Sequence, residues 1–181
     1  MQQQLAVGRM GVHLATTILQ KRYPIIEDLQ SSKSMQKRGV DLFVEGLGYL
    51  EVKTDTHSPE RVFLELDVGG KPGAVDRSCA DYFCVLFPGY RVLYLMARAE
   101  LQQWLREKYA WIAGTHPDWV KTVHSKSQQS TWSARGVVVP RVLLAQGVNL
   151  GVIEWEEGDE NLEGKRDAVK PVVDRDRAVG C

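Results

Sequence analysis

The chain has 181 residues, 44% of them hydrophobic and 25% charged, with 23 basic and 23 acidic side chains. This length predicts one globular domain with a core large enough to need neither a disulfide framework nor a structural zinc. The three cysteines have no C-x-x-C spacing, and there is neither an N-terminal leader nor an apolar run of roughly 20 residues. We therefore expect a reduced, cytoplasmic protein without a membrane span.

Charge is unevenly distributed along the chain. From Glu156 onward there are eight acidic and five basic residues, whereas residues 1–155 contain 18 basic and 15 acidic ones. The last segment also has too little apolar surface to fold alone. We expect a mildly basic folded domain over residues 1–155 and an acidic, disordered tail over residues 156–181.

The N-terminal half of the chain predicts one helix followed by short strands. Residues 2–22 place apolar side chains at helical spacing, and Pro24 ends the pattern. The polar stretch 30–39 predicts a loop. Alternating apolar and polar residues then predict three strands of an antiparallel meander, over residues 40–44, 49–54 and 61–68.

The C-terminal half predicts two buried strands and a second long helix. A short helix before Ala80 is followed by apolar strands with a hinge at Pro88, and then by leucines and aromatics at helical spacing. Residues 114–136 are polar and predict a long surface loop. The expected elements are strands 82–87 and 91–96, helix 98–112, strand 137–140 and short helix 141–146. Together they predict a mixed α/β domain.

The register of the first two strands determines which polar side chains meet. Apolar residues of both strands share a core face only if the numbers of opposed residues sum to an even value, and a sum of 92 also leaves a short glycine turn. This register pairs Asp41 with Glu51 and puts Lys53 two residues further along the same face. The core face would then hold Val40, Leu42, Val44, Leu50 and Val52.

Two carboxylates and a lysine on one patch favour a divalent cation. The carboxylates repel each other unless a positive charge lies between them, and hard oxygen ligands with room for water suit Mg²⁺. Such an ion activates water and neutralises charge on a phosphodiester, while the lysine orients the water. The pattern therefore indicates phosphodiester hydrolysis.

The acid that begins one strand, the Glu-x-Lys sequence on the next, the glycine turn and the preceding helix resemble the PD-(D/E)xK nuclease superfamily, which has the restriction endonuclease-like fold. The resemblance covers residues 2–87, and the stretch 51–55 is similar to small phage and bacterial members. It implies Asp41 and Glu51 as metal ligands, with the Val52 carbonyl beside them, and Lys53 as the catalytic lysine. The implied activity is Mg²⁺- or Mn²⁺-dependent DNA hydrolysis, more often endonucleolytic, leaving a 5′ phosphate.

One feature departs from that family. Many members carry a glutamate on the first helix, whereas this chain has no acid between Gln2 and Tyr23. His13 is a candidate replacement, although a histidine beside an apolar stripe is commonly packed or solvated. The departure favours an alternative function, a non-catalytic nucleic-acid-binding or assembly protein that retains the fold.

Two further acids are candidate accessory residues. Glu65 alternates with apolar residues on its strand, so it either extends the acidic patch beside Glu51 or faces solvent. Asp55 follows Lys53 on the same strand and either holds the lysine, binds a second ion or forms a turn.

DNA is the expected partner, and basic residues near the candidate site suit its phosphates. Some precede Asp41 in the polar loop 30–39, and others lie beside an aromatic residue in the polar segment 114–136; solvated loops are the alternative. The net charge of the body is small, so a homodimer, a partner or a structured substrate would strengthen binding. The candidate phosphate ligands are Lys33, Lys37, Arg38, Lys126 and Arg135.

Overall fold

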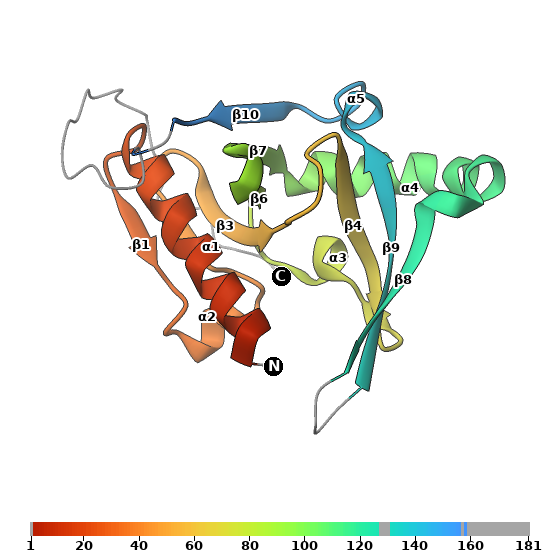
Figure 1. Cartoon of the computed structure of the whole chain (residues 1–181), viewed down its shortest axis with the longest axis horizontal. Helices are drawn as coiled ribbons and strands as arrows, with labels where there is room; N and C mark the ends of the chain where they lie inside the picture. Colours follow the sequence, from red (N-terminus) through yellow and green to blue (C-terminus); the bar gives the residue numbers. More distant parts are fainter. Residues whose placement is uncertain (1, 127–130, 157, 159–181) are drawn as a thin grey trace.

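The computed structural model describes residues 2–126, 131–156 and 158, whose strands form two sheets (Figure 1). The first is mixed and has the strand order β1-β2-β3-β6-β7-β10. Its strands are β1 (Ile26–Asp28), β2 (Leu42–Val44), β3 (Gly48–Thr54), β6 (Tyr82–Phe87), β7 (Val92–Ala97) and β10 (Leu150–Glu154). The second is antiparallel, with the order β5-β4-β9-β8. Its strands are β5 (Lys71–Pro72), β4 (Arg61–Val68), β9 (Thr131–Pro140) and β8 (Val120–Lys126).

Helices flank the mixed sheet on both faces, so the α/β class predicted from the sequence is confirmed (Figure 1). The α-helices are α1 (Gln2–Gln20), α2 (Lys33–Lys37), α3 (Ala74–Arg77), α4 (Arg98–Thr115) and α5 (Arg141–Leu144). Short 3₁₀ helices are η1 (Pro88–Tyr90) and η2 (Pro117–Trp119). No helix within the described residues is both long and apolar enough to cross a membrane.

The apolar strand β6 is central because both of its faces are buried. Phe83, Val85 and Phe87 pack in the core between the two sheets, together with α4. Cys84 and Leu86 point the other way, into the core beneath α1. A strand that is apolar on both sides needs a neighbour on each edge and a layer on each face, as in α/β sheets. β3 and β7 supply the edges, with β3 parallel to β6.

The predicted meander of strands 40–44, 49–54 and 61–68 is wrong in its third strand. β4 lies in the second sheet, whereas β3 pairs with β6 and β2. The link after β3 turns away at Asp55, and the Tyr94 hydroxyl donates a 3.1 Å hydrogen bond to the Pro59 carbonyl. An antiparallel meander does exist one strand earlier, formed by β1, β2 and β3.

Two predicted loops contain regular structure. The polar segment 114–136 holds η2 and most of a long hairpin of β8 and β9, and β9 extends the strand expected at 137–140. Residues 121–124 of β8 are exposed, so their polarity did not conflict with strand pairing. The segment 30–39 contains α2, where Ser32 caps the first turn through the Met35 N–H. The tail expected over 156–181 lies outside the described residues, apart from 156 and 158.

Candidate functional site

The predicted register between β2 and β3 is confirmed. Opposed residues sum to 92 over the three pairs that the ladder contains, which are Leu42–Leu50, Phe43–Tyr49 and Val44–Gly48. Gly46 and Gly48 have positive φ angles of 88° and 93°, as the short turn requires. The apolar pattern therefore specified the pairing.

The ladder ends one residue before the predicted partners Asp41 and Glu51, which are not directly opposed. The Asp41 N–H donates a 2.8 Å bond to the Leu50 carbonyl. Asp41 Oδ2 in turn accepts a 2.8 Å hydrogen bond from the Val52 N–H. The Asp41 carboxylate thus accepts the hydrogen bond that a backbone carbonyl would accept if the ladder continued, and this bond anchors it to β3.

The expectation that Val40 shares the core face of Leu42 is also wrong. Leu42 packs beneath α1, whereas Val40 belongs to a separate small cluster. Gly39, which has a φ of 65°, redirects the chain just before Val40. The residues packed around Val40 are Leu29, Met35, Tyr49, Cys79 and Ala80.

Glu51 is the most unusual side chain of this region because it is a carboxylate with only 3% of its surface exposed. Its Oε1 atom forms a 2.5 Å ion pair with Lys53 Nζ. Its Oε2 atom is buried and has no hydrogen-bond partner among the described residues. A buried acceptor without a partner costs free energy, and a cation or a water molecule bound at Oε2 would remove that cost.

Gly39 and Ser78 pack closely around Glu51 Oε2. A Cβ atom added to Gly39 would lie 3.2 Å from Oε2 and 3.2 Å from Ser78 Oγ. The Ser78 hydroxyl cannot donate to Glu51, because it already donates a 2.7 Å hydrogen bond to the Gly39 carbonyl. A side chain at position 39 would therefore crowd Oε2.

The pKa values of Asp41 and Lys53 are both raised, for different reasons. Burial is the main cause that raises the pKa of Asp41, the charges of Glu51 and Asp28 add to it, and the Val52 N–H and Lys53 oppose it. Burial alone would lower the pKa of Lys53, but Glu51 and further carboxylates outweigh burial, so that pKa is raised. Lys53 is therefore a stable cation beside the acids.

Asp28 is a nearby acid that the sequence interpretation missed. It ends β1, a strand of only three residues whose partner is β2. The Leu29 N–H donates to the Asp41 carbonyl at 2.9 Å, which places the end of β1 beside Asp41. So short a strand has no periodicity from which its pairing could be recognised.

Asp41, Glu51 and the Val52 carbonyl are the oxygen donors of this region that could hold Mg²⁺ or Mn²⁺. The N–H and C=O of one strand residue point to the same side, so the Val52 carbonyl lies on the side of Asp41. The described residues contain no group of three or more His, Cys, Asp or Glu side chains that could hold a metal. Two carboxylates and one carbonyl match hard cations that retain several waters.

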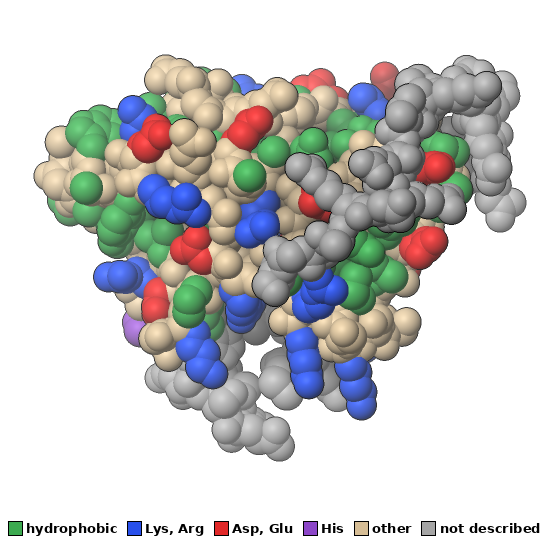
Figure 2. Space-filling view, turned by 180° about the vertical axis from the view of Figure 1, so that it is seen from behind, with side chains coloured by type: hydrophobic (Ala, Val, Ile, Leu, Met, Phe, Trp, Pro, Cys, Tyr) green, Lys and Arg blue, Asp and Glu red, His purple; other side chains and the backbone are tan. Residues whose placement is uncertain are grey.

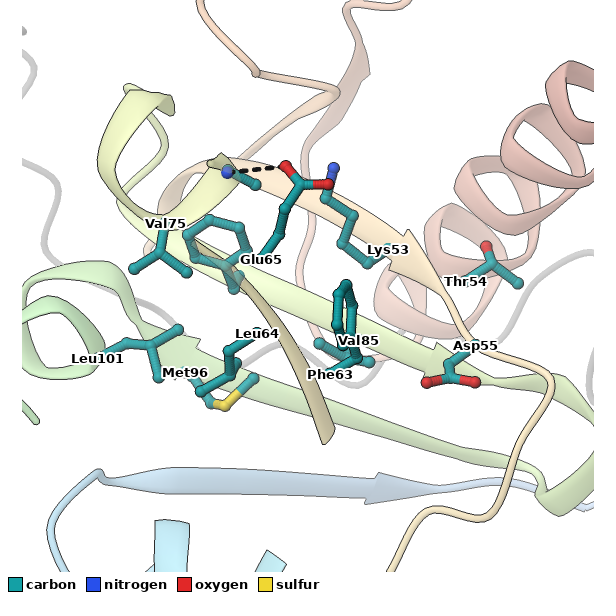
Figure 3. A pocket seen from close by; sticks show the side chains of 12 residues that line it. Lys53, Thr54, Asp55, Phe63, Leu64, Glu65, Val75, Val85, Met96 and Leu101 are labelled. Carbon is teal, nitrogen blue, oxygen red and sulfur yellow. Dashed lines mark hydrogen bonds between the residues drawn. The ribbon is translucent and has the colours of Figure 1, made fainter. Parts of the chain in front are cut away.

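A cavity of about 150 Å³ lies between the two sheets, next to Lys53 (Figure 3). Glu65 lines it, and its Oε1 accepts a 2.9 Å hydrogen bond from the Ala74 N–H at the start of α3. The accessory residue Glu65 thus lies beside Lys53, on the other sheet. Most of the remaining lining is apolar and includes Phe63, Leu64, Val75, Phe83, Val85, Met96 and Leu101.

The other two accessory candidates have ordinary structural surroundings. Asp55 also lines the cavity, but its Oδ1 accepts from the His57 N–H and contacts the His57 ring, each at 2.8 Å, which is a turn arrangement. His13 is exposed on α1, whose contact with β3 includes Gly11 against Thr54. The structure does not bring His13 to the carboxylates.

The candidate phosphate ligands lie on or next to α2 and on the second sheet. Lys33 and Lys37 are exposed, and Arg38 is partly exposed next to Gly39. Arg135 is exposed on β9, whereas the Lys126 side chain lies outside the described residues. Lys and Arg side chains occur across the lower half of the face in Figure 2.

Comparison of the chain with protein-family models, with curated proteins and with solved structures found no match. The site is therefore defined by its own geometry. That geometry is one anchored carboxylate on Asp41, one buried carboxylate on Glu51 and one ammonium on Lys53.

Proposed function

We propose that the protein is a metal-dependent nuclease that hydrolyses DNA phosphodiester bonds with Mg²⁺ or Mn²⁺. The observation that carries the proposal is the buried, unpartnered Oε2 atom of Glu51, close to the anchored carboxylate of Asp41. A protein gains nothing in stability from such an atom unless a ligand satisfies it. A divalent cation held by Asp41, Glu51 and the Val52 carbonyl is the ligand that fits best.

The order of elements supports placing this protein in the restriction endonuclease-like fold of the PD-(D/E)xK superfamily. The helix α1 precedes the antiparallel strands β1, β2 and β3, with α2 inserted between β1 and β2. After β4 and β5 of the second sheet, the short helix α3 leads to β6, which is parallel to β3. That superfamily has a core of a helix, a three-stranded meander, a helix and a further strand. The candidate residues lie on β3 and just before β2, where the family motif places them.

Each residue has a distinct role in the proposed reaction. Asp41, Glu51 and the Val52 carbonyl would hold the divalent ion, which would supply a coordinated water of lowered pKa and positive charge for the phosphate. Asp41 is held in place by the Val52 N–H, so its carboxylate needs little reorganisation to bind. Lys53 remains charged because its pKa is raised by Glu51, and it orients the attacking water or stabilises the pentavalent phosphate.

The proposal is tested with Mn²⁺ and a panel of linear, flapped and branched DNA substrates and matched RNAs. We expect cleavage of at least one substrate, its loss in EDTA, and its loss in Glu51→Gln, which keeps the side-chain volume but removes the charge. Cleavage that survives Glu51→Gln, or no cleavage of any substrate, would contradict the proposal.

The second candidate is a non-catalytic nucleic-acid-binding or assembly protein. Two observations favour it: α1 has no acid, and Lys53 already occupies one oxygen of Glu51. This alternative predicts nucleic-acid binding that is independent of metal and unchanged in Glu51→Gln, with no cleaved product. The same panel, read by both binding and cleavage, separates the two functions. A homodimer remains a prediction, which sedimentation of the purified chain would test.

A further inference from the structure

We propose that Glu65 is a positioning residue that serves as the second anchor of Lys53, taking over its ammonium when Glu51 engages a divalent cation. The inference rests on the proposed metal site at Asp41 and Glu51. Glu65, on β4 of the second sheet, would then determine how readily Glu51 is released from Lys53 to bind the cation.

The need for a second anchor follows from the ion pair already present. Lys53 Nζ lies 2.5 Å from Glu51 Oε1, so the lysine competes for the charge that a cation would bind. Two positive charges on one buried carboxylate repel each other strongly. A cation at Oε2 would draw charge away from Oε1 and weaken this pair, which favours a change of partner by Lys53.

Glu65 is held where it can receive the lysine. Its Oε1 atom is fixed by the Ala74 N–H at 2.9 Å, while its negative charge acts on Lys53. Figure 3 shows the side chains of Glu65 and Lys53 directed to the same end of the cavity. Gly73 packs so closely on the Glu65 carbonyl that an added Cβ would overlap it, which fixes this part of the backbone.

Lys53 also has room to change partner. Its side chain is 45% exposed, although Glu51 beside it is almost fully buried. The cavity of about 150 Å³ between the sheets borders both Lys53 and Glu65. A rotation of a flexible lysine side chain requires no backbone movement.

The contribution of Glu65 can be isolated by a double-mutant cycle on Mn²⁺ affinity, measured calorimetrically in the absence of DNA. The proteins are wild type, Glu65→Gln, Lys53→Met and the double variant. Glutamine keeps an acceptor for the Ala74 N–H but removes the charge. Asp67→Asn, further along β4, is the control for loss of a nearby negative charge.

We expect Glu65→Gln to weaken Mn²⁺ binding by at least about threefold in the wild-type background, the size typical of coupled residues. In the Lys53→Met background, the same change should weaken binding no more than Asp67→Asn does, because no lysine remains to be held. Should Glu65→Gln fail to fold, as judged by circular dichroism, the cycle is run with Glu65→Met.

Two results would overturn the inference, and they differ in what else they overturn. Equal losses from Glu65→Gln with and without Lys53 would show an ordinary charge effect and leave the metal site intact. No Mn²⁺ binding by the wild-type protein would contradict the proposed function itself, and the inference with it.

Discussion

The Val52 N–H donates a 2.8 Å hydrogen bond to Asp41 Oδ2, so a side chain completes the pairing between β2 and β3. This bond fixes a carboxylate beside the buried Glu51 at a point where the backbone ladder has ended. The site is thus part of the sheet's own hydrogen bonding, and changes to it should alter both stability and function.

Replacement of Asp41 by asparagine should stabilise the metal-free protein at neutral pH. The folded-state pKa of Asp41 is raised above the ordinary value of 3.8, so the folded protein holds the proton more tightly than the unfolded chain. Its contribution to stability therefore falls as pH rises from 3.8 through the folded value. Asparagine avoids the charge and still accepts from Val52.

Urea unfolding in EDTA between pH 3 and pH 8 measures this effect. At a pH above the folded-state pKa of Asp41, the free energy of unfolding of Asp41→Asn should exceed that of wild type. The difference should shrink toward zero below pH 3.8. An Asp41→Asn variant that is less stable than wild type at pH 7 would show that the carboxylate charge is favourable in the fold.

Gly39→Ala should weaken Mn²⁺ binding as well as folding. The positive φ of 65° costs a non-glycine residue about 1–2 kcal/mol, and the new methyl would lie 3.2 Å from Glu51 Oε2. Gly69→Ala is the matched control, since Gly69 has a φ of 59° and open space around it. We expect both variants to lose stability through the positive φ, Gly39→Ala more than Gly69→Ala because of its close contacts, and only Gly39→Ala to bind Mn²⁺ more weakly. Equal Mn²⁺ affinities would contradict the proposed position of the cation.

The packing of α1 on β3 can be tested with two glycines of the same helix. A Cβ on Gly11 would overlap Thr54 Oγ1, whereas a Cβ on Gly8 meets nothing within 4 Å. Gly11→Ala should lower the free energy of unfolding by about 1–3 kcal/mol through overpacking. Gly8→Ala should raise it by about 0.5–1 kcal/mol through helix propensity. Chemical unfolding measures both, and an unchanged Gly11→Ala would mean that the helix sits further from the strand.

Lys37 on α2 should contribute to DNA affinity through phosphate contact. Lys37→Gln should weaken binding to all sequences similarly and reduce the slope of log affinity against log salt by about 1. Lys108→Gln on α4 is the control, because Lys108 is also exposed and α4 lies apart from α2 (Figure 1). Fluorescence anisotropy over a salt series, with Ca²⁺ in place of Mn²⁺, gives the slopes. Equal slopes for the two variants would show that Lys37 on α2 does not contact the DNA phosphates.

The local part of the site could be predicted from the sequence. Alternation within strands 42–44 and 48–54 specified a register that places Asp41 near Glu51 and Lys53. This prediction concerns two neighbouring strands joined by a short turn. In such a pair the register determines which side chains lie on the same face of the sheet.

The non-local part could not be predicted in the same way. Glu65 lies near Lys53 because β4 joins a different sheet, and its partner β9 lies far along the chain. The sequence of β8 gave no strand signal, because residues 121–124 have no buried face. Alternating apolar and polar residues indicate a strand with one buried face. A strand without a buried face therefore cannot be recognised from this pattern.

Mn²⁺-dependent cleavage by two folded lysine variants tests the central claim most directly. Lys53→Met removes the ammonium beside Glu51, while Lys108→Met removes one from the exposed face of α4. With a DNA substrate that the wild-type protein cuts, we predict that Lys53→Met loses at least about a hundredfold in rate and Lys108→Met keeps the wild-type rate. A Lys53→Met protein that cuts as fast as wild type would contradict the account.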